Sequence, residues 1–277
     1  MRKKPIIALI YDFDGTLSPG NMQEFGFIQA VGKTTSEFWT MSDGIAIDHD
    51  ASNVLSYMKL MFDEAKKSGI ALRRDNFKKF GAKIELFDGV KEWFRLVNDY
   101  GKQHGVVIEH YINSSGLKEI IEGSPIAHEF KHVFAGSFIY NQEGEAEWPG
   151  VAVDYTAKTQ FLFKINKGIF SSQDNKMVNK SVSDDRKRVP FSHMVYFGDG
   201  DTDVPCMKIV GMFGGHSIAV YNPSNSRKKA TAGKLKKQGR VSFALRAIYT
   251  EDSKAFEVVK AIINKIKADY ELLQLSR

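Results

Sequence analysis

The chain has 277 residues, 43% of them hydrophobic and 26% charged, with a net charge of +6, values close to those of ordinary globular proteins. No apolar run reaches the roughly 18 to 20 residues that a membrane span needs, so we expect neither a membrane span nor a signal peptide, and a cytoplasmic protein. Cys206 is the single cysteine, which excludes an intrachain disulfide.

The first predicted element is a strand. The run from Ile6 to Tyr11 is almost wholly apolar and begins with β-branched side chains, a pattern typical of a strand buried on both faces of a sheet. Residues 21–86 then show helical periodicity, clearest from Val54 onward, and contain no convincing strand. A further amphipathic helix is predicted from Asp88, as its N-cap, to Gly101, where a glycine ends the apolar stripe.

From residue 106 onward, strands alternate with helices. Strands are predicted at 106–112, 133–140, 193–197 and 217–221, and helices at 117–122, 157–167 and from Phe256 to Leu273. A hairpin is predicted at 141–144, and the polar stretch 171–188 is the best candidate for a mobile surface loop. Such alternation implies right-handed crossovers and therefore an α/β fold with a three-layer, doubly wound, mainly parallel sheet.

The positive charge is concentrated in one segment. Residues 222–246 contain eight Lys and Arg side chains and no acidic residue. We interpret the segment as a solvated helix face followed by a basic loop, because Phe243 is the only aromatic residue among these cations. We therefore expect no nucleic-acid partner, and a phosphate-rich partner remains an alternative.

Acidic residues follow two of the predicted strands. Asp12 and Asp14 come directly after the first strand, and Asp199, Asp201 and Asp203 come after the strand at 193–197. Because ligands of such sheets bind beyond the carboxyl ends of the strands, these side chains are candidates for one site. Carboxylates that converge repel one another unless a cation lies between them, and an oxygen-seeking divalent ion, Mg²⁺, is the simplest solution.

The chain resembles the phosphatases of the haloacid dehalogenase superfamily, and among them the phosphoserine-phosphatase-like branch. The first motif of that superfamily, D-x-D-G-T-L, is present as Asp12 to Leu17, and the fourth, G-D-x-x-x-D, as Gly198 to Asp203. Ser114, in the sequence Ile112 to Gly116, is similar to the second motif, although Ser115 replaces a glycine there. Lys158 near a helix start resembles the third motif, with Lys164 and Lys167 as alternatives.

The resemblance implies a role for each matching residue. Asp12 is the expected nucleophile that forms a phosphoaspartyl intermediate, and Asp14 is the expected general acid and base. Magnesium would bind the carboxylates of Asp12 and Asp199 and the backbone carbonyl of Asp14. The residues expected to bind the substrate phosphate are Ser114, Lys158, Thr16 and Gly15, where Gly15 also permits the tight turn. Asp203 is expected to hold the lysine or to support the metal from behind.

The resemblance also implies an architecture and an activity. The expected fold is a Rossmann-like core, residues 1–18 and 87–277, with a helical cap domain, residues 19–86, inserted after the first motif. The expected activity is magnesium-dependent hydrolysis of a phosphate monoester of a small molecule, with substrate choice made by the cap. A phosphomutase or other phosphotransferase is an alternative, as is a non-catalytic module that binds an anionic partner through residues 227–246. Neither the substrate nor the oligomeric state can be read from the sequence.

Two other motifs suggest different chemistry. His128 to His132 matches H-E-x-x-H, the signature of zinc proteases, but that motif requires a sustained helix, whereas Pro125 and a predicted strand flank it. The spacing of Asp199, Asp201 and Asp203 is similar to the start of a calcium-binding EF-hand loop, but the glycine and glutamate that such a loop requires are Val204 and Val210. We therefore favour the phosphatase interpretation.

Overall fold

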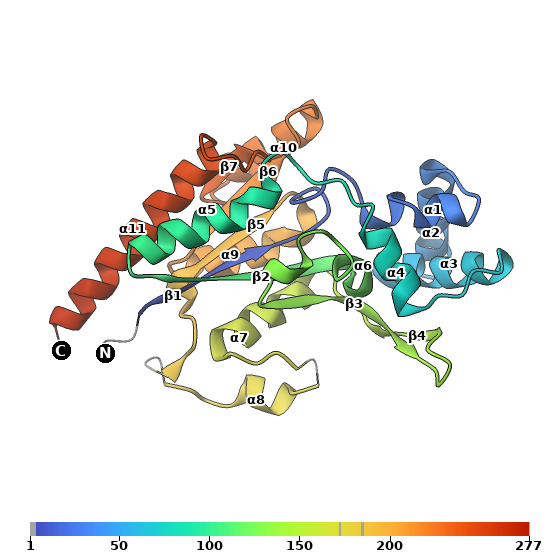
Figure 1. Cartoon of the computed structure of the whole chain (residues 1–277), viewed down its shortest axis with the longest axis horizontal. Helices are drawn as coiled ribbons and strands as arrows, with labels where there is room; N and C mark the ends of the chain where they lie inside the picture. The colour runs from blue at the N-terminus through green and yellow to red at the C-terminus, as the bar shows by residue number, and fades with distance from the viewer. Residues whose placement is uncertain (1–3, 172, 184–185, 277) are drawn as a thin grey trace.

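The computed structural model describes residues 4–171, 173–183 and 186–276, and within them one mainly parallel sheet forms the centre of the molecule (Figure 1). The strands lie in the order β4-β3-β2-β1-β5-β6-β7. They are β1 (Ile6–Tyr11), β2 (Val107–Leu117), β3 (His132–Tyr140), β4 (Ala146–Val151), β5 (Met194–Gly198), β6 (His216–Tyr221) and β7 (Phe243–Arg246). Only β4 runs antiparallel to its neighbour, so the predicted doubly wound, mainly parallel sheet is confirmed.

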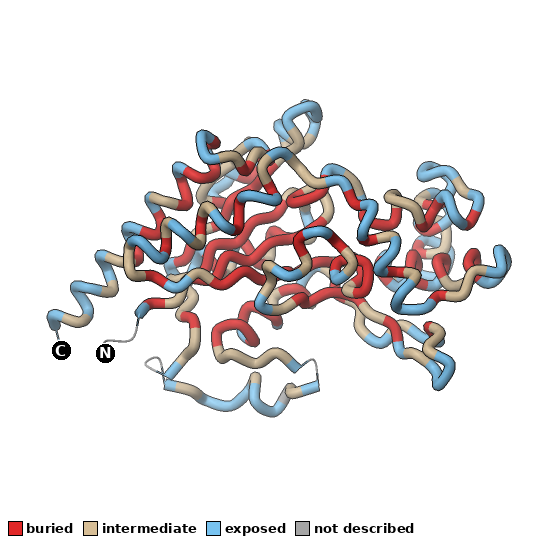
Figure 2. Tube along the Cα trace, viewed as in Figure 1, coloured by how far each residue is buried: buried red, intermediate tan, exposed pale blue. Residues whose placement is uncertain are grey.

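Helices cover both faces of this sheet, because successive side chains of a strand point to opposite faces. One face packs against α5 (Val90–Gln103) and α11 (Lys254–Leu275), where Leu9 shares an apolar cluster with Trp93 and Val259. The other face packs against α7 (Thr159–Lys167), α9 (Val204–Met212) and α10 (Ser226–Lys237), where Ile10 lies with Leu162. The buried stretches of the chain accordingly run through the sheet (Figure 2).

The region after β1 is helical, as predicted. It contains η1 (Met22–Glu24), α1 (Phe27–Ala30), α2 (Thr35–Asp48), α3 (Asn53–Lys67) and α4 (Arg74–Gly81), gathered at one end of the molecule (Figure 1). Thr34 and Glu37 form a capping box at the start of α2, and the side chain of Ser52 caps α3. We call residues 19–86 the cap. Among the described residues, the cap pairs with the sheet region through one isolated β-bridge, from Arg73 to Glu145.

The predicted ends of α5 are wrong. Its N-cap is Gly89 and not Asp88, and the helix continues through Gly101 to Gln103. Gly89 has a φ of +77°, and a Cβ there would lie 2.5 Å from the backbone nitrogen of Thr250, while the Asp88 carbonyl accepts a hydrogen bond from the backbone of Tyr249. A chain segment remote in sequence therefore fixes this helix start.

The connecting segments differ in part from the predictions. The remaining elements are α6 (Lys118–Ile121), η2 (Ala127–Glu129), η3 (Tyr155–Lys158), α8 (Asn175–Asn179), η5 (Phe191–His193) and η6 (Asp201–Asp203). The loop predicted at 171–188 includes residues 172, 184 and 185, which lie outside the described residues, and its described part contains α8. The basic segment contains α10, but its end is strand β7, which pairs with β6 in place of a loop. None of the described helices is both long and apolar enough to cross a membrane.

Candidate active site

The predicted site residues of the first and fourth motifs meet at the carboxyl ends of β1 and β5. Gly15 has a φ of +73°, and a Cβ at this position would lie 2.2 Å from Oδ2 of Asp199. A glycine is therefore required both by the turn after β1 and by the approach of the Asp199 carboxylate. This contact places Asp199 beside the peptide that joins Asp14 to Gly15.

A buried lysine joins two of the carboxylates. The Nζ of Lys158, at the end of η3, lies 3.0 Å from Oδ1 of Asp12 and 2.7 Å from Oδ1 of Asp203. The Lys158 side chain is fully buried. Although burial by itself lowers the pKa of Lys158, the carboxylates of Asp12 and Asp203 raise it above its ordinary value, so the ammonium stays charged.

Asp203 is held by several donors at once. Its Oδ1 also accepts a hydrogen bond from the hydroxyl of Tyr196 at 2.8 Å, and its Oδ2 accepts from the backbone N–H groups of Asp199 and Gly200 at 3.2 and 3.4 Å. With both oxygens engaged, Asp203 orients Lys158 and the loop after β5 and has little capacity left for another ligand.

The Asp14 carboxyl group is placed by the start of the cap. Its Oδ1 accepts a hydrogen bond from the backbone N–H of Met22 at 3.0 Å. Burial, followed by the charge of Asp12, raises the pKa of Asp14 well above its ordinary value. A raised pKa favours the protonated form of a carboxyl group, which is the form that can protonate a leaving oxygen.

The charge in this cluster suits a cation. The pKa of Asp12 is raised to about 7, first by burial and then by the Asp203 carboxylate, and burial also raises the pKa of Asp199. Carboxylate oxygens of Asp12, Asp199 and Asp203 lie within 4.8 Å of one another. Because both oxygens of Asp203 already accept hydrogen bonds, the carboxylates of Asp12 and Asp199 are the ones left to bind an ion. An all-oxygen set with excess negative charge fits Mg²⁺.

The serine predicted to bind phosphate lies inside a strand and not after it. Ser114 belongs to β2, which continues to Leu117 with a shift in its pairing to β3. The Oγ of Ser114 accepts a hydrogen bond from the N–H of Gly116 at 3.0 Å, so its hydroxyl proton is still available. Ser115 also lies on the cavity wall, and its Oγ has no partner among the described residues.

A cavity of about 260 Å³ connects these groups with the cap. From the sheet side it is lined by Asp12, Asp14, Ser114, Ser115, Gly116, Asp199 and Thr202. Lys158 and Gly15 are not among the lining residues, although Lys158 contacts Asp12, which is. Thr16, predicted to bind phosphate, is fully buried, with its N–H bonded to the Phe13 carbonyl and its own carbonyl bonded to the Tyr249 hydroxyl. The structure therefore does not bring Thr16 to the cavity.

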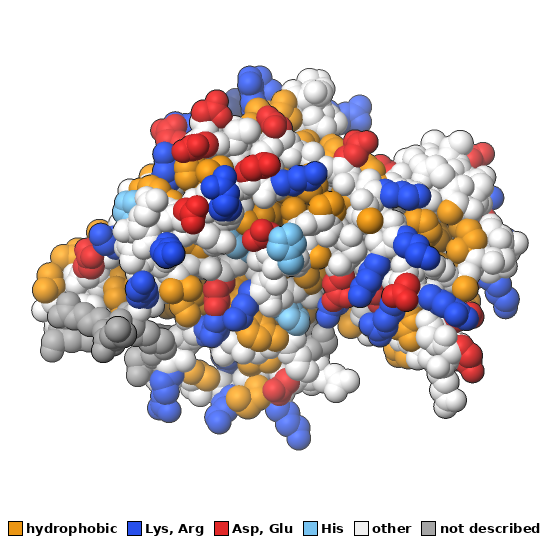
Figure 3. Space-filling model, viewed as in Figure 1, with side chains coloured by type: hydrophobic (Ala, Val, Ile, Leu, Met, Phe, Trp, Pro, Cys, Tyr) orange, Lys and Arg blue, Asp and Glu red, His pale blue; other side chains and the backbone are white. Residues whose placement is uncertain are grey.

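One charged residue of the site was missed in the sequence. The sequence predicts Lys228 of α10 to lie on a solvated basic face. In the structure its Nζ lies 2.7 Å from Oδ2 of Asp199. The signal that could have found it is its position, shortly after the carboxyl end of β6. Elsewhere, on the face shown in Figure 3, basic and acidic side chains are interspersed and form no continuous basic stripe.

The H-E-x-x-H segment does not form a metal-binding helix. His128 lies in η2 and is exposed, whereas His132 begins β3 and packs its ring on Phe134 and Phe170. Burial, together with nearby lysines, lowers the pKa of His132 to about 4. The two imidazoles therefore have unrelated environments, which argues against a zinc-protease site.

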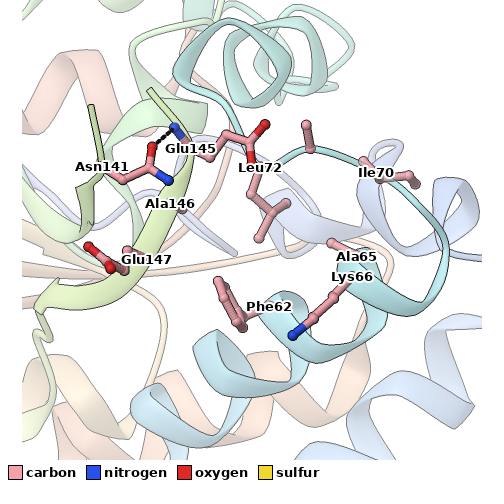
Figure 4. Close-up of a pocket in the computed structure, with 10 residues that line it drawn as sticks. Phe62, Ala65, Lys66, Ile70, Leu72, Asn141, Glu145, Ala146 and Glu147 are labelled. Carbon is pink, nitrogen blue, oxygen red and sulfur yellow. Dashed lines mark hydrogen bonds between the residues drawn. The ribbon is translucent and has the colours of Figure 1, made fainter. Parts of the chain in front are cut away.

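A second cavity, of about 270 Å³, lies between α3 and the β3–β4 hairpin (Figure 4). Phe62 and Leu72 line it from the cap, and Glu145 and Glu147 line it from the hairpin. None of the residues predicted to act in catalysis lies on its wall. The cavity with the carboxylates is therefore the better candidate for the active site.

Comparisons with known proteins agree with this geometry. The sequence model of one family, described as haloacid dehalogenase-like hydrolase, matches residues 9–208, which include both acidic motifs. A protein of Borreliella burgdorferi described as uncharacterized is 29% identical over 92% of this chain and 95% of its own length.

Solved structures share the fold. A substrate-bound phosphoserine phosphatase has a TM-score of 0.55 and 18% identity, over 94% of this chain and 99% of its own. A probable phosphoserine phosphatase from Vibrio cholerae has a TM-score of 0.58 and 12% identity, over 96% of this chain and 67% of its own. At such identities the likeness concerns the fold alone.

Proposed function

This chain belongs to the haloacid dehalogenase-like hydrolases, and from that premise we propose that it is a magnesium-dependent phosphatase that hydrolyses a phosphate monoester of a small molecule through a phosphoaspartyl intermediate on Asp12. The observation that carries the proposal is the contact of the buried Lys158 ammonium with both Asp12 and Asp203, directly behind the cavity that Asp14, Ser114 and Asp199 line. We also propose residues 1–18 and 87–277 as the catalytic core and 19–86 as the cap.

The first chemical step needs a nucleophile and an acid. The Asp12 carboxylate attacks phosphorus, the bond between phosphorus and the ester oxygen breaks, and the leaving alcohol takes the proton that Asp14 holds. The raised pKa of Asp14 supports this role, because it favours the protonated carboxyl. Lys158 and the Ser114 hydroxyl stabilise the charge that develops on the transferred group.

The second step returns the enzyme to its starting state. Asp14, now ionised, takes a proton from water, and that water attacks phosphorus and releases inorganic phosphate and the Asp12 carboxylate. Magnesium held by Asp12, Asp199 and the Asp14 carbonyl would offset the negative charge of the phosphoryl group and the carboxylates. Tyr57 of α3 donates a hydrogen bond to the Ser115 carbonyl at 2.8 Å, which holds the cap against the core and limits entry of water.

The test is release of phosphate from a panel of phosphate monoesters with Mg²⁺, for the wild type, Asp12→Asn and Asp14→Asn. We expect Asp12→Asn to lower turnover by on the order of 10³-fold or more, and Asp14→Asn by about 10² to 10⁴-fold while it still binds Mg²⁺. Asp201→Asn removes an exposed carboxylate from the same loop and serves as the matched control, with activity close to wild type. Undiminished turnover of Asp12→Asn, or full activity in EDTA, would contradict the proposal.

A further inference from the structure

The cap side of the active-site cavity differs in charge from its sheet side. Among the described residues that line the cavity from the cap there is no Lys or Arg. The residues that line the cavity from the cap include Gln23, Trp39, Asp43 and Tyr57. A leaving group with a carboxylate would lose hydration in this cavity without gaining a cationic partner, which makes such a group unfavourable.

Negative charge is built into this wall. Asp43 of α2 lies on the cavity wall with an exposed side chain. Glu24 contacts two residues of the wall, because its Oε1 accepts hydrogen bonds from the Trp39 indole N–H and from the Asn21 amide, both at 2.8 Å. The cap side of the cavity therefore has one carboxylate on its wall, Asp43, and a second, Glu24, bonded to that wall, whereas no described Lys or Arg lines it.

Two aromatic rings complete the wall. Trp39 and Tyr57 pack edge to face, with centroids 6.1 Å apart and planes at 73°. The bond to Glu24 fixes the indole, and the bond from the Tyr57 hydroxyl to the Ser115 carbonyl fixes the phenol, so neither ring must be ordered when a ligand binds. Aromatic faces attract ammonium groups, most strongly where water is partly excluded.

An unpartnered acceptor lies on the same wall. Gln23 in η1 is 1% exposed, and its Oε1 has no hydrogen-bond partner among the described residues. A buried amide oxygen without a partner is costly, so a ligand that donates a hydrogen bond here regains that free energy. The unpartnered Gln23 oxygen is independent of the carboxylates and the aromatic rings of the wall. It indicates that the ligand carries a hydrogen-bond donor.

We propose that the substrate is the phosphate monoester of a small amino alcohol, whose ammonium group is recognised by Trp39, Tyr57 and Asp43 and donates to Gln23. The inference rests on the proposed phosphatase activity. The cavity of about 260 Å³ is at the small end for ligand sites, which favours a leaving group of a few heavy atoms over a nucleoside.

The first experiment compares kcat/KM for four esters of similar size: phosphoethanolamine, glycerol 3-phosphate, O-phosphoserine and 3-phosphoglycerate. The leaving group of the first carries an ammonium group, and that of the second is uncharged. O-Phosphoserine carries both an ammonium group and a carboxylate, and 3-phosphoglycerate carries a carboxylate alone. We expect phosphoethanolamine to exceed glycerol 3-phosphate by roughly tenfold and both carboxylates by more. A value for glycerol 3-phosphate or either carboxylate equal to or above that of phosphoethanolamine would overturn the inference.

The second experiment assigns the preference to the cap. Asp43→Asn is expected to lower kcat/KM for phosphoethanolamine about fivefold and to leave glycerol 3-phosphate within twofold. Asp48→Asn, which removes an exposed carboxylate of the same helix away from the cavity, is the matched control and should change neither value. Equal losses for both esters in Asp43→Asn, or no loss for either, would contradict the assignment.

The two proposals fail in different ways. An enzyme that hydrolyses p-nitrophenyl phosphate with Mg²⁺ but shows no preference for the amino alcohol ester retains the proposed function and loses this inference. An enzyme that hydrolyses none of the esters, p-nitrophenyl phosphate included, contradicts the proposed function itself.

Discussion

The strand β2 carries a cluster of charged residues around the buried Glu109 at its beginning and borders an acidic cluster at its end, and the charges of the two clusters are balanced differently. Near its beginning, Glu109 accepts hydrogen bonds from Arg188 and from the Tyr111 hydroxyl, and Lys131 lies 3.9 Å away. Near its end lie Asp12, Asp14, Asp199 and Asp203, and among the described residues Lys158 and Lys228 form ion pairs with this group.

This difference separates a charge-balanced cluster from the candidate active site. The Glu109 charge is matched within the protein, so the cluster needs no ligand. In the other cluster, acids outnumber bases and the pKa values of Asp12, Asp14 and Asp199 are all raised, so the fold keeps an excess of negative charge that a bound cation can relieve. Single substitutions can change the charge of one cluster while the other stays intact.

The largest effect is expected for Lys158→Met, which removes the buried cation from the unbalanced cluster. Asp12 and Asp203 would remain buried beside each other, so the free energy of unfolding should fall by about 3 to 5 kcal/mol. Turnover should fall by on the order of 10³-fold, since the charge on the transferred group loses a fixed partner. Urea denaturation and a phosphate-release assay measure the two effects, and Lys167→Met on the neighbouring helix is the control for turnover.

His110, another buried polar residue of β2, is kept neutral by the fold. The His110 ring accepts from the Tyr11 hydroxyl at 3.1 Å and lies 3.1 Å from the Asn98 amide oxygen, and the Trp93 indole donates to Tyr11. Burial lowers the pKa of His110 to about 3. The unfolded chain therefore binds a proton near pH 6.5 that the folded protein excludes.

Stability should consequently fall as the pH is lowered from about 6.5 toward 3, by up to about 1.4 kcal/mol per pH unit for this one group. Above that window the contribution of the neutral imidazole is fully present. His110→Gln should reduce the slope of unfolding free energy against pH, whatever its effect at neutral pH, while His128→Gln on the surface should leave the slope unchanged. An unchanged slope in His110→Gln would assign the acid sensitivity to other groups.

A smaller effect is expected for Arg188→Met in the balanced cluster. Glu109 would keep its bond from Tyr111 and the nearby Lys131, so the free energy of unfolding should fall by about 1 to 2 kcal/mol. Because this cluster lies at the other end of β2, kcat/KM should stay within twofold of wild type. A loss of activity comparable with that of Lys158→Met would remove the distinction between the clusters.

The smallest effect is expected for Lys228→Met, because the Lys228 side chain is 45% exposed and its interaction with Asp199 is partly screened. Removal of this cation makes the cluster more negative, so Mg²⁺ should bind about three to tenfold more tightly in a calorimetric titration without substrate. Lys229→Met, exposed on the same helix, is the matched control. Weaker binding of Mg²⁺ in Lys228→Met would mean that this lysine positions Asp199 more than it competes with the ion.

Much of the core was predictable because its signals are local. The apolar run of β1, the change to alternating strands and helices after residue 106, and the acidic turns after β1 and β5 each lie within a few adjacent residues. The errors lie where distant segments meet. Gly89 starts α5 because the backbone near Thr250 passes it, and β7 becomes a strand by pairing with β6.

The sequence by itself determined the family, the parallel sheet and the acids at its carboxyl edge, because these depend on residue type and short spacing along the chain. Only the tertiary structure decided that Lys158 bridges Asp12 and Asp203, that Thr16 is fully buried and does not line the cavity, and that Lys228 reaches Asp199. It also decided which cap residues line the cavity. Each of these facts depends on contacts between residues that lie far apart in the chain, and their distances are set by packing rather than by local periodicity.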